Sequence, residues 1–489
     1  MSDQEYDVVV IGAGPSGENV ADRVQRGGLS AVVVESELVG GECSYWACVP
    51  SKALLRPPAA LAAARAVDGA RQAVTGDLAA EAVLARRTRF THGWVDDSSQ
   101  VAWLDRKGIA LIRGRARLAG DRKVEVTDSD GETTTVAARH AVVIATGSTA
   151  AIPPIRGLTE PLVWTSREAT SAETVPGRLA IMGGGVVACE MATAWRALGA
   201  EVTLLERSPG LLPRLEPFAG EMVAASLRSA GVQVRTNTSV ARVRRLARAT
   251  PVEIWTGDAD PDQPADLIAD ELLVAAGRAP RTSGLGLESI GLAPETPETA
   301  GGWLAVDDSC LVEAVPGGWL YAVGDVNRRN LLTHMGKYQA RACGDAIVAR
   351  ARGELNGPPS PWSELAASAD HLGAPQVIFT EPEVASVGLT EAAARQQNLP
   401  VRAVDHEIGD VSGARLSADG YAGRARFVVD DERKVLIGAT FVGPGIAELL
   451  HSATVAVVGE VPLGRLWHAV PSFPTISEVW LRLLETYGL

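Results

Sequence analysis

Several features that would mark whole classes of protein are missing from this 489-residue sequence. It has five cysteines, which are too few for the disulfide framework of a secreted scaffold. No apolar run reaches the roughly 20 residues of a membrane helix. The first residues, Met1–Asp7, lack the basic and apolar segments of a signal peptide. The sequence therefore predicts a soluble cytoplasmic protein.

Basic residues are also fewer than acidic residues. Lysine and arginine number 46 against 59 acidic residues, which gives a formal net charge of -13. Nucleic acids and anionic membrane surfaces are poor partners for such a chain, because both attract basic proteins. We predict that neither is bound.

A strand, a glycine-rich turn and a helix open the chain. The apolar run Asp7–Ile11 is typical of a buried parallel strand, and Gly12, Gly14 and Gly17 follow it. These glycines would allow, in order, a tight turn, close approach of a pyrophosphate and close helix packing. Glu35, at the end of the next strand, could accept hydrogen bonds from an adenosine ribose. We interpret this segment as a dinucleotide-binding unit, the alternative being a glycine-rich turn that only packs.

The same pattern recurs in the middle of the chain. The strand Arg178–Met182 leads into Gly183 and Gly185, and the following strand ends at Glu206. Two such units imply two nucleotides, for which a tightly held flavin and a diffusing nicotinamide are a natural pair. Glu206 favours NAD(H) over NADP(H), because a carboxylate accepts from a ribose 2'-OH and repels a 2'-phosphate. Arg207, the next residue, argues in the opposite direction.

Two cysteines follow the first unit at short range. Cys43 and Cys48 could close a small disulfide if the chain bends into a helix between them, because the bridge needs α-carbons within roughly 4.4–6.8 Å. A second such pair would have suggested zinc, and the sequence contains none. The spacing therefore suggests redox chemistry without a metal. We expect Cys189 on a packing helix, Cys310 in strand-like and Cys343 in helix-like surroundings to be small buried hydrophobes.

Further short boxes occur in the order seen in the flavoprotein disulfide reductases. Besides the first glycine turn, they are Gly40–Lys52, Ala145–Ser148, Gly183–Glu190, Ala276–Pro280 and Tyr321–Asp325. From Tyr6 to Glu478 the chain strongly resembles class I of that family, which includes dihydrolipoamide dehydrogenase, glutathione reductase and mercuric reductase.

The resemblance implies an α/β fold. Two Rossmann-like dinucleotide-binding domains, for FAD and for NAD(P), would be followed by a C-terminal α+β dimerisation domain, so that the working form is a homodimer. The chain length and its 46% hydrophobic residues fit several domains. The expected limits are 1–150 for the FAD domain, 151–277 for the NAD(P) domain, 278–352 for a central segment completing the FAD site, 353–374 for a linker and 375–489 for the interface domain.

The resemblance also implies roles for single residues. Cys43 would be the interchange thiol that attacks a substrate, and Cys48 would face the flavin as a charge-transfer thiolate. Lys52 resembles the lysine beside flavin N5 and Glu190 its carboxylate partner, the alternative being a surface ion pair. Asp325 resembles the aspartate that binds the ribityl chain, the alternative being a turn aspartate. The residues expected to bind the cofactors are Gly12, Gly14, Gly17, Glu35, Gly41, Lys52, Thr146, Gly147, Gly183, Gly185, Glu206, Gly277, Gly324 and Asp325.

The reaction implied by the resemblance is hydride transfer from NAD(P)H to FAD. Two electrons would then pass to the Cys43–Cys48 disulfide and on to a disulfide or another small oxidant. One alternative is a quinone or dye reductase in which the flavin passes electrons directly. Another is a flavin-binding scaffold without activity.

One position departs from the family pattern. A partner-subunit loop of typical members reads His-Pro-Thr-x-Ser-Glu, and its histidine protonates the departing thiol; here Phe473 takes that position while the carboxylate Glu478 remains. Phenylalanine cannot exchange a proton, which argues against efficient reduction of lipoyl or glutathione disulfides. A bend at Pro471 could bring His468 to the site, the alternative being a surface or interface histidine. Mercuric reductase also lacks the histidine, but its C-terminal cysteine pair is missing here.

The pair Tyr45 and Trp46 between the redox cysteines is a second departure, because relatives carry smaller or more polar residues there. These rings could narrow the pocket or stack on a planar substrate. Core packing is the alternative.

Overall fold

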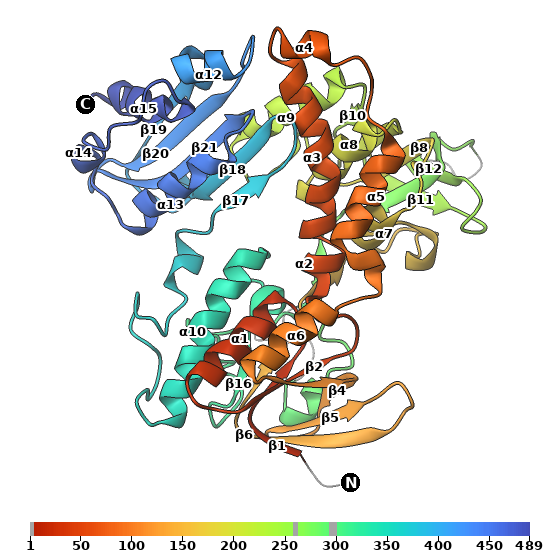
Figure 1. Ribbon diagram of the computed structural model, residues 1–489, viewed down its shortest axis with the longest axis vertical. Coiled ribbons are helices and arrows are strands. Elements are labelled where there is room, and N and C mark those ends of the chain that lie inside the picture. Colours follow the sequence, from red (N-terminus) through yellow and green to blue (C-terminus); the bar gives the residue numbers. More distant parts are fainter. Residues whose placement is uncertain (1–3, 258–262, 293–300) are drawn as a thin grey trace. The chain divides into compact units, whose positions relative to one another are not determined.

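The computed structural model describes residues 4–257, 263–292 and 301–489 (Figure 1). The stretch Met1–Asp7 is therefore described only from Gln4 onward. The chain forms two compact units, each built from separate segments: residues 1–49, 91–149 and 278–371 make the first, and residues 50–90, 150–277 and 372–489 make the second. Both mix helices with sheets, so the expected α/β fold class is confirmed. Within the described ranges, no helix is long and apolar enough to cross a bilayer.

A mostly parallel sheet forms the core of the first unit. Its strand order is β3-β2-β1-β6-β5-β4, and β16 also pairs with β6. The pairs among β1, β2, β3, β6 and β16 are parallel, whereas β4 and β5 are antiparallel to their neighbours. Val8–Val10 have no exposed surface, as expected for a strand covered on both faces. The strands are β1 (Gln4–Ile11), β2 (Ala31–Glu35), β3 (Ala110–Arg113), β4 (Arg115–Leu118), β5 (Lys123–Thr127), β6 (Thr133–Ile144) and β16 (Leu320–Ala322).

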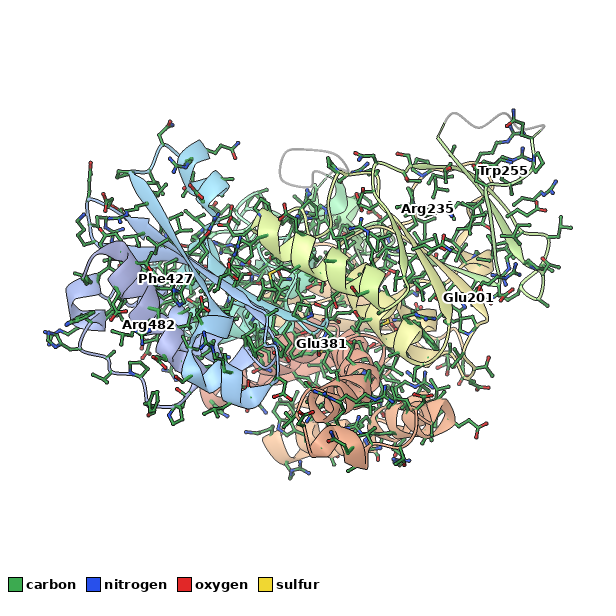
Figure 2. The ribbon with its side chains drawn as sticks, turned by 90° about the horizontal axis from the view of Figure 1, so that it is seen from above. Glu201, Arg235, Trp255, Glu381, Phe427 and Arg482 are labelled. Atoms are coloured by element: carbon green, nitrogen blue, oxygen red, sulfur yellow. The ribbon has the colours of Figure 1, made fainter. Side chains whose placement is uncertain are left out.

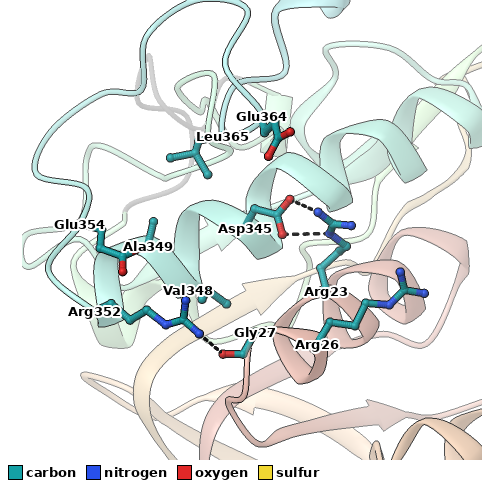
Figure 3. Close-up of a pocket in the computed structure, with 10 residues that line it drawn as sticks. All are labelled: Arg23, Arg26, Gly27, Asp345, Val348, Ala349, Arg352, Glu354, Glu364 and Leu365. Carbon is teal, nitrogen blue, oxygen red and sulfur yellow. Dashed lines mark hydrogen bonds and ion pairs between the residues drawn. The ribbon is translucent and has the colours of Figure 1, made fainter.

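Two helices of the first unit, α1 and α10, pack side by side (Figure 1). A Cβ atom added at Gly336 of α10 would lie 2.4 Å from Ser16 Oγ of α1. Further along both helices, Arg23 Nε donates to Asp345 Oδ1 at 2.9 Å (Figure 3). The helices therefore run in the same direction. The helices of this unit are α1 (Pro15–Arg26), α2 (Gly41–Tyr45), α6 (Ser98–Lys107) and α10 (Thr333–Ala351), with the short turns η1 (His92–Trp94), η3 (Leu287–Ile290), η5 (Gly324–Asn327) and η6 (Ser368–His371).

A hollow of about 570 Å³ lies beside the Arg23–Asp345 ion pair (Figure 3). Arg352 Nη2 donates to the carbonyl oxygen of Gly27 at 2.8 Å across the same hollow. Two polar interactions thus join the sides of this hollow, and we assign it no function.

The second unit contains a smaller parallel sheet. Its order is β10-β9-β8-β14, and a separate antiparallel sheet has the order β11-β12-β13. The predicted strand Arg178–Met182 is β8. The other strands are β9 (Glu201–Leu205), β10 (Gln233–Arg235), β11 (Val240–Arg244), β12 (Val252–Thr256), β13 (Leu267–Ala269) and β14 (Glu271–Val274). The helices are α3 (Cys48–Arg65), α4 (Ala70–Ala73), α5 (Ala80–Phe90), α7 (Ser166–Ser171), α8 (Val186–Ala197) and α9 (Pro217–Ser229), with the turn η2 (Glu160–Leu162); the first two residues of α3 belong to the first unit.

The C-terminal part of the second unit is an antiparallel sheet with the order β17-β18-β21-β20-β19. Phe427 of β20 is buried, and its ring lies 6.3 Å from Phe441 and 4.8 Å from Trp480, between ring centroids (Figure 2). The strands are β17 (Gln376–Ile378), β18 (Glu383–Gly388), β19 (Val401–Glu407), β20 (Arg424–Asp430) and β21 (Val435–Gly443). The helices are α11 (Glu391–Gln396), α12 (Ser412–Ser417), α13 (Leu450–Val458), α14 (Leu463–Leu466) and α15 (Val479–Tyr487), with the turns η7 (Ile408–Asp410), η8 (Ala447–Leu449) and η9 (Ile476–Glu478).

Candidate active site

Glycine is required at two points of the first unit. Gly12 has φ +102°, and a Cβ there would lie 2.6 Å from the carbonyl oxygen of Ala145. Gly41 has φ +59°, and a Cβ there would lie 2.9 Å from the α-carbon of Gly14. Any side chain would therefore strain the backbone or collide with it. The two glycine segments meet backbone to backbone.

These segments form one wall of a cavity of about 470 Å³ within the first unit. Many residues expected to bind FAD line it, together with two groups of the redox region. These are Gly12, Gly14, Glu35, Gly41, Thr146, Gly147 and Asp325, with Cys43 and Thr333.

Two glycines expected to bind a cofactor, Gly17 and Gly324, are not among the residues that line this cavity. A Cβ at Gly17 would lie 1.9 Å from the carbonyl oxygen of Gly12, which agrees with its expected packing role. The N–H of Gly324 donates to Gln339 Oε1 at 2.9 Å. Both glycines therefore help to position the backbone that surrounds the cavity.

Polar groups of the cavity fit a dinucleotide. Glu35 Oε2 accepts from the N–H of Ala13 at 2.8 Å, which holds the carboxylate beside the glycine turn. Thr146 Oγ1 is buried without a hydrogen-bond partner in the part of the chain that the structure describes. Such an orphaned hydroxyl is costly unless a ligand completes it. The glycine turn at a helix N-terminus offers N–H groups to a pyrophosphate.

Asp325 belongs to a buried polar network. Ser148 Oγ donates to its carboxylate, and Arg278 Nε donates to Ser148 Oγ at 3.0 Å. Burial raises the pKa of Asp325, while the Ser148 hydrogen bond and the Arg278 charge lower it. The aspartate is thus fixed at the cavity wall in the turn η5.

The redox cysteines lie on two successive helices. Cys43 is on α2, Cys48 is the first residue of α3, and both side chains are partly buried. Cys48 Sγ lies 3.3 Å from Thr333 Oγ1, at the start of α10. A hydrogen bond with Cys48 and burial raise the pKa of Cys43, whereas Thr333 and the charge of Lys337 lower it. The two sulfurs are therefore hydrogen-bonding neighbours.

Tyr45 and Trp46 differ in exposure. Tyr45 is 2% exposed, its hydroxyl lies 3.4 Å from the carbonyl oxygen of Asp96, and its own carbonyl accepts from Trp94 Nε1 at 2.7 Å. Core packing therefore describes Tyr45. The Trp46 ring, 5.6 Å from Tyr45 between centroids, is only partly buried, so both interpretations stay open for it.

A buried ion pair connects α3 and α8 in the second unit. Lys52 Nζ lies 2.8 and 3.0 Å from the two carboxylate oxygens of Glu190. Glu190 also accepts from the N–H of Phe379 at 3.0 Å. Its side chain is 4% exposed against 36% for Lys52. The carboxylate of the pair is thus buried, whereas the lysine is only partly covered.

Replacing Lys52 by methionine is expected to lower the midpoint of thermal unfolding. The change leaves the Glu190 carboxylate buried without a counter-charge, which costs about 3–5 kcal/mol in comparable pairs, or on the order of 3–5 °C in a chain of 489 residues. The double variant K52M/E190L should recover most of this loss, because it removes the buried charge. Calorimetry decides the point, with Lys123→Met as a control at an exposed lysine; equal midpoints for K52M and the control would contradict the expected role of the pair.

The second glycine turn carries an acidic residue as predicted. Gly183 has φ +120°, and Gly185 is the N-cap of α8. Glu206 is buried, and a Cβ at Gly184 would lie 2.8 Å from its Oε2, so the carboxylate lies over the glycine turn. Arg207 is exposed.

Gly277, another residue expected to bind a cofactor, follows the end of strand β14 by three residues. It has φ +141°, and its carbonyl accepts from the N–H of Ala151 at 3.0 Å. The conformation suits glycine, because few other residues adopt it.

The C-terminal loop leaves a carboxylate oxygen free. Phe473 is 75% exposed, and His468 is also exposed. Glu478 is 8% exposed, and its Oε1 accepts from Arg482 Nη2 at 2.6 Å. Its Oε2 is buried with no hydrogen-bond partner among the described residues. One oxygen of the expected catalytic carboxylate is therefore paired with arginine, and the other has no partner in the described residues.

Sequence reasoning missed Thr333 and Gln339. Thr333 carries no motif, and only the fold brings it to Cys48. Gln339 carries none either, and only the fold brings it to the N–H of Gly324. Both belong to the first unit.

The other cysteines behave as predicted, with one correction. Cys189, Cys310 and Cys343 are fully buried free thiols. Cys310, however, lies in a turn with φ +64° and not in a strand.

Sequence comparisons cover nearly the whole chain. Residues 6–346 match the family described as Pyridine nucleotide-disulphide oxidoreductase, and residues 374–483 match its dimerisation domain. The chain is 31% identical to a dihydrolipoyl dehydrogenase of Chlorobaculum tepidum, over 97% of this chain and 95% of that protein. It is also 31% identical to a mercuric reductase of Shigella flexneri, over 96% of this chain and 78% of that protein.

Solved structures share the fold. The HOCl-induced flavoprotein disulfide reductase RclA of Escherichia coli, solved as a Cu(II) complex, superposes with a TM-score of 0.81 at 24% identity, over 99% of each chain. LpdA of Mycobacterium tuberculosis also has a TM-score of 0.81, at 23% identity, over 99% of this chain and all of that one.

Proposed function

Because the chain belongs to the pyridine nucleotide-disulphide oxidoreductase family, we propose that it passes electrons from a nicotinamide through FAD to the Cys43–Cys48 pair and on to a disulfide or another small oxidant. Members of this family are oxidoreductases that use FAD and a pyridine nucleotide. The observation that carries the proposal is the position of the thiols. Cys43 lines the dinucleotide cavity, and Cys48 hydrogen-bonds to it.

The chemistry that FAD would supply when bound is to accept a hydride and then to pass on two electrons. The chain's own groups then carry out thiol exchange. Cys43, as a thiolate, attacks one sulfur of a substrate disulfide, which forms a mixed disulfide and releases the other sulfur as a thiolate that takes a proton from water. Cys48 attacks Cys43 Sγ in turn, which releases the second thiol and closes the Cys43–Cys48 disulfide.

The remaining expected residues have proposed roles around these steps. Gly12, Gly14 and Gly41 would give the pyrophosphate access to the backbone, and Glu35 would hold the adenosine ribose. Lys52, paired with the Glu190 carboxylate, would lie beside the flavin ring.

NAD(H) is the proposed nicotinamide. Glu206 lies over the second glycine turn, where a carboxylate accepts from a ribose 2'-OH and repels a 2'-phosphate. The exposed Arg207 is the residue that would favour NADP(H) instead.

A homodimer is the proposed working form. Residues 374–483 match the family's dimerisation domain, close to the expected interface domain 375–489.

The second candidate function is a quinone or dye reductase. It is favoured by Phe473, which cannot act as the acid that releases a thiol. In that case electrons would leave the flavin directly, and Cys43 would be dispensable.

Anaerobic titration of the yellow protein with NADH, and separately with NADPH, tests the proposal. A long-wavelength charge-transfer band after two electrons is expected, because a Cys48 thiolate would face the flavin. Bleaching without this band would reject the thiol route in favour of direct flavin acceptors. No reduction by either nucleotide would leave only the scaffold alternative.

A further inference from the structure

One buried polar side chain of the first unit has no part in the proposed reaction. Gln339 belongs to α10, the long helix beside α1 (Figure 1), and it has no exposed surface. Met335 and Cys343, one turn before and one turn after it, are buried as well. Burying an amide is costly unless it is hydrogen-bonded, so a hydrocarbon side chain would suit a purely apolar position better. The hydrogen bonds of Gln339 therefore need an explanation.

The carboxamide of Gln339 links two short turns. Its Oε1 accepts from the backbone N–H of Gly324 and from Asn327 Nδ2, each at 2.9 Å. Its Nε2 donates to Asp370 Oδ2, also at 2.9 Å. Gly324 and Asn327 are the first and last residues of η5, and Asp370 belongs to η6. One side chain thus joins turns that are far apart in the sequence.

The direction of these bonds is fixed by the partners. The N–H of Gly324 can only donate, whereas the Asp370 carboxylate accepts. Asp370 is anchored in turn, because its carboxylate accepts from Asn330 Nδ2 at 3.2 Å and lies 3.4 Å from Arg329 Nε. An amide at position 339 meets both demands, whereas a carboxylate there would face the carboxylate of Asp370.

The turn η5 carries a carboxylate that lines the cofactor cavity. Asp325 follows Gly324 directly and lines the cavity, where Ser148 Oγ donates to it. Gly324 has φ +76°, and a Cβ there would lie 2.6 Å from Ser16 Oγ of α1. Close packing against α1 and the hydrogen bond to Gln339 therefore both hold the residue that precedes Asp325.

A binding group works best when it is held within about 0.5 Å of its productive position. Without the Gln339 amide, the N–H of Gly324 and the carboxylate of Asp370 would be left buried and unpaired, which is costly. The turn would relieve that cost by moving, and Asp325 would move with it. Gln339 itself is not among the residues that line the cavity.

We propose that Gln339 is a positioning residue of the cofactor cavity, which holds Asp325 in place through the turn η5 and thereby sets how slowly FAD is released. The inference rests on the part of the proposed function in which FAD occupies this cavity. It does not depend on the route that the electrons take afterwards.

The test is the rate at which FAD leaves the holoenzyme. The FAD-loaded protein is diluted to nanomolar concentration at pH 8, and the fluorescence of the released flavin is followed with time. Gln339→Met keeps the approximate volume of the side chain and removes its hydrogen bonds to Gly324, Asn327 and Asp370. Q339M should release FAD about ten to a hundred times faster than the wild type, because buried polar groups are left unpaired.

A double-mutant cycle separates positioning from a general loss of stability. D325A removes the carboxylate through which Gln339 is proposed to act, and it should itself speed the release. In the D325A background, Q339M should add less than about twofold, because the group that it positions is gone. A merely structural loss would add its full factor in both backgrounds.

A pair of variants tests the hydrogen bond between Gln339 and Asp370 directly. Q339E should speed the release at least as much as Q339M, because it sets one carboxylate against another. Q339E/D370N reverses the direction of the bond, because the amide at position 370 donates to the carboxylate at position 339. The double variant should return the rate to within about threefold of the wild type. Cys343→Ala removes another buried group of α10 and should leave the rate unchanged.

Equal release rates for wild type and Q339M would overturn the inference, as would an equal acceleration by Q339M with and without the Asp325 carboxylate. If Q339M does not fold, a Q339E/D370N protein that releases FAD as fast as Q339E would overturn it instead. A wild-type protein that takes up no FAD would overturn the proposed function and the inference together. Unchanged rates in FAD-loaded variants would overturn the inference alone.

Discussion

Cys43→Ser is expected to lower kcat/KM for a small disulfide by at least about a thousandfold, because a serine hydroxyl cannot form the mixed disulfide. Cys43 is the thiol that lines the cavity, and Cys48 hydrogen-bonds to it from the start of α3. The NADH-dependent reduction of a quinone should persist in C43S, because direct flavin transfer needs no thiol. Steady-state rates with glutathione disulfide or lipoamide and with a quinone measure the two activities on one preparation.

The control for this loss is Cys343→Ala. Cys343 is fully buried on α10, and alanine is a good helix former, so the variant should keep both activities. Disulfide turnover that survives in C43S would assign the thiol chemistry to another residue. If the wild type reduces a quinone but not a disulfide, the direct flavin route would be established.

Phe473→His is expected to raise the rate of disulfide reduction by about a hundredfold to ten-thousandfold, which is the range that general acid–base catalysis supplies. The reason lies in Glu478, whose buried Oε2 has no hydrogen-bond partner in the described chain. We expect an imidazole at position 473 to use this carboxylate, five residues further along the chain, for its orientation. The gain should appear in kcat/KM for lipoamide and glutathione disulfide and not in quinone reduction.

Two further variants define that gain. Phe473→Leu cannot exchange a proton and should behave as the wild type. F473H/E478Q should lose most of the improvement, because the amide orients the imidazole less well than a carboxylate. Equal rates for F473H and F473L would show that the substrate does not need an acid at this position.

Much of the fold could be predicted because its elements have local causes. The apolar run before Gly12 is typical of a buried strand, and the positive φ values of Gly12 and Gly183 explain why glycine recurs at both turns. Cys310 shows the limit of such reasoning: its apolar neighbours suggested a strand, but the chain turns there with φ +64°. The domain limits were placed from motif positions and stay predictions.

The candidate site was harder to predict where it depends on packing. Lys52 and Glu190 could be paired because a known family pairs such residues, and the structure brings them within 2.8 Å. Thr333 and Lys337 could not be found, because which face of α10 meets the cysteines is decided by its packing on α1. Gln339 could not be linked to the turn η5 from sequence, because only tertiary packing brings the two together.

The contact between Thr333 and Cys48 has a consequence for the reduction potential of the cysteine pair. A hydroxyl 3.3 Å from the sulfur stabilises a thiolate there, and hence the reduced form, when it donates to it. A hydrogen bond to a charged group is worth about 1.5–3 kcal/mol, which corresponds to roughly 30–65 mV for a two-electron couple. The pair would be a correspondingly stronger oxidant than the same cysteines without the hydroxyl. Acceptors it can serve must then lie at more positive potentials, which narrows the choice of physiological oxidant.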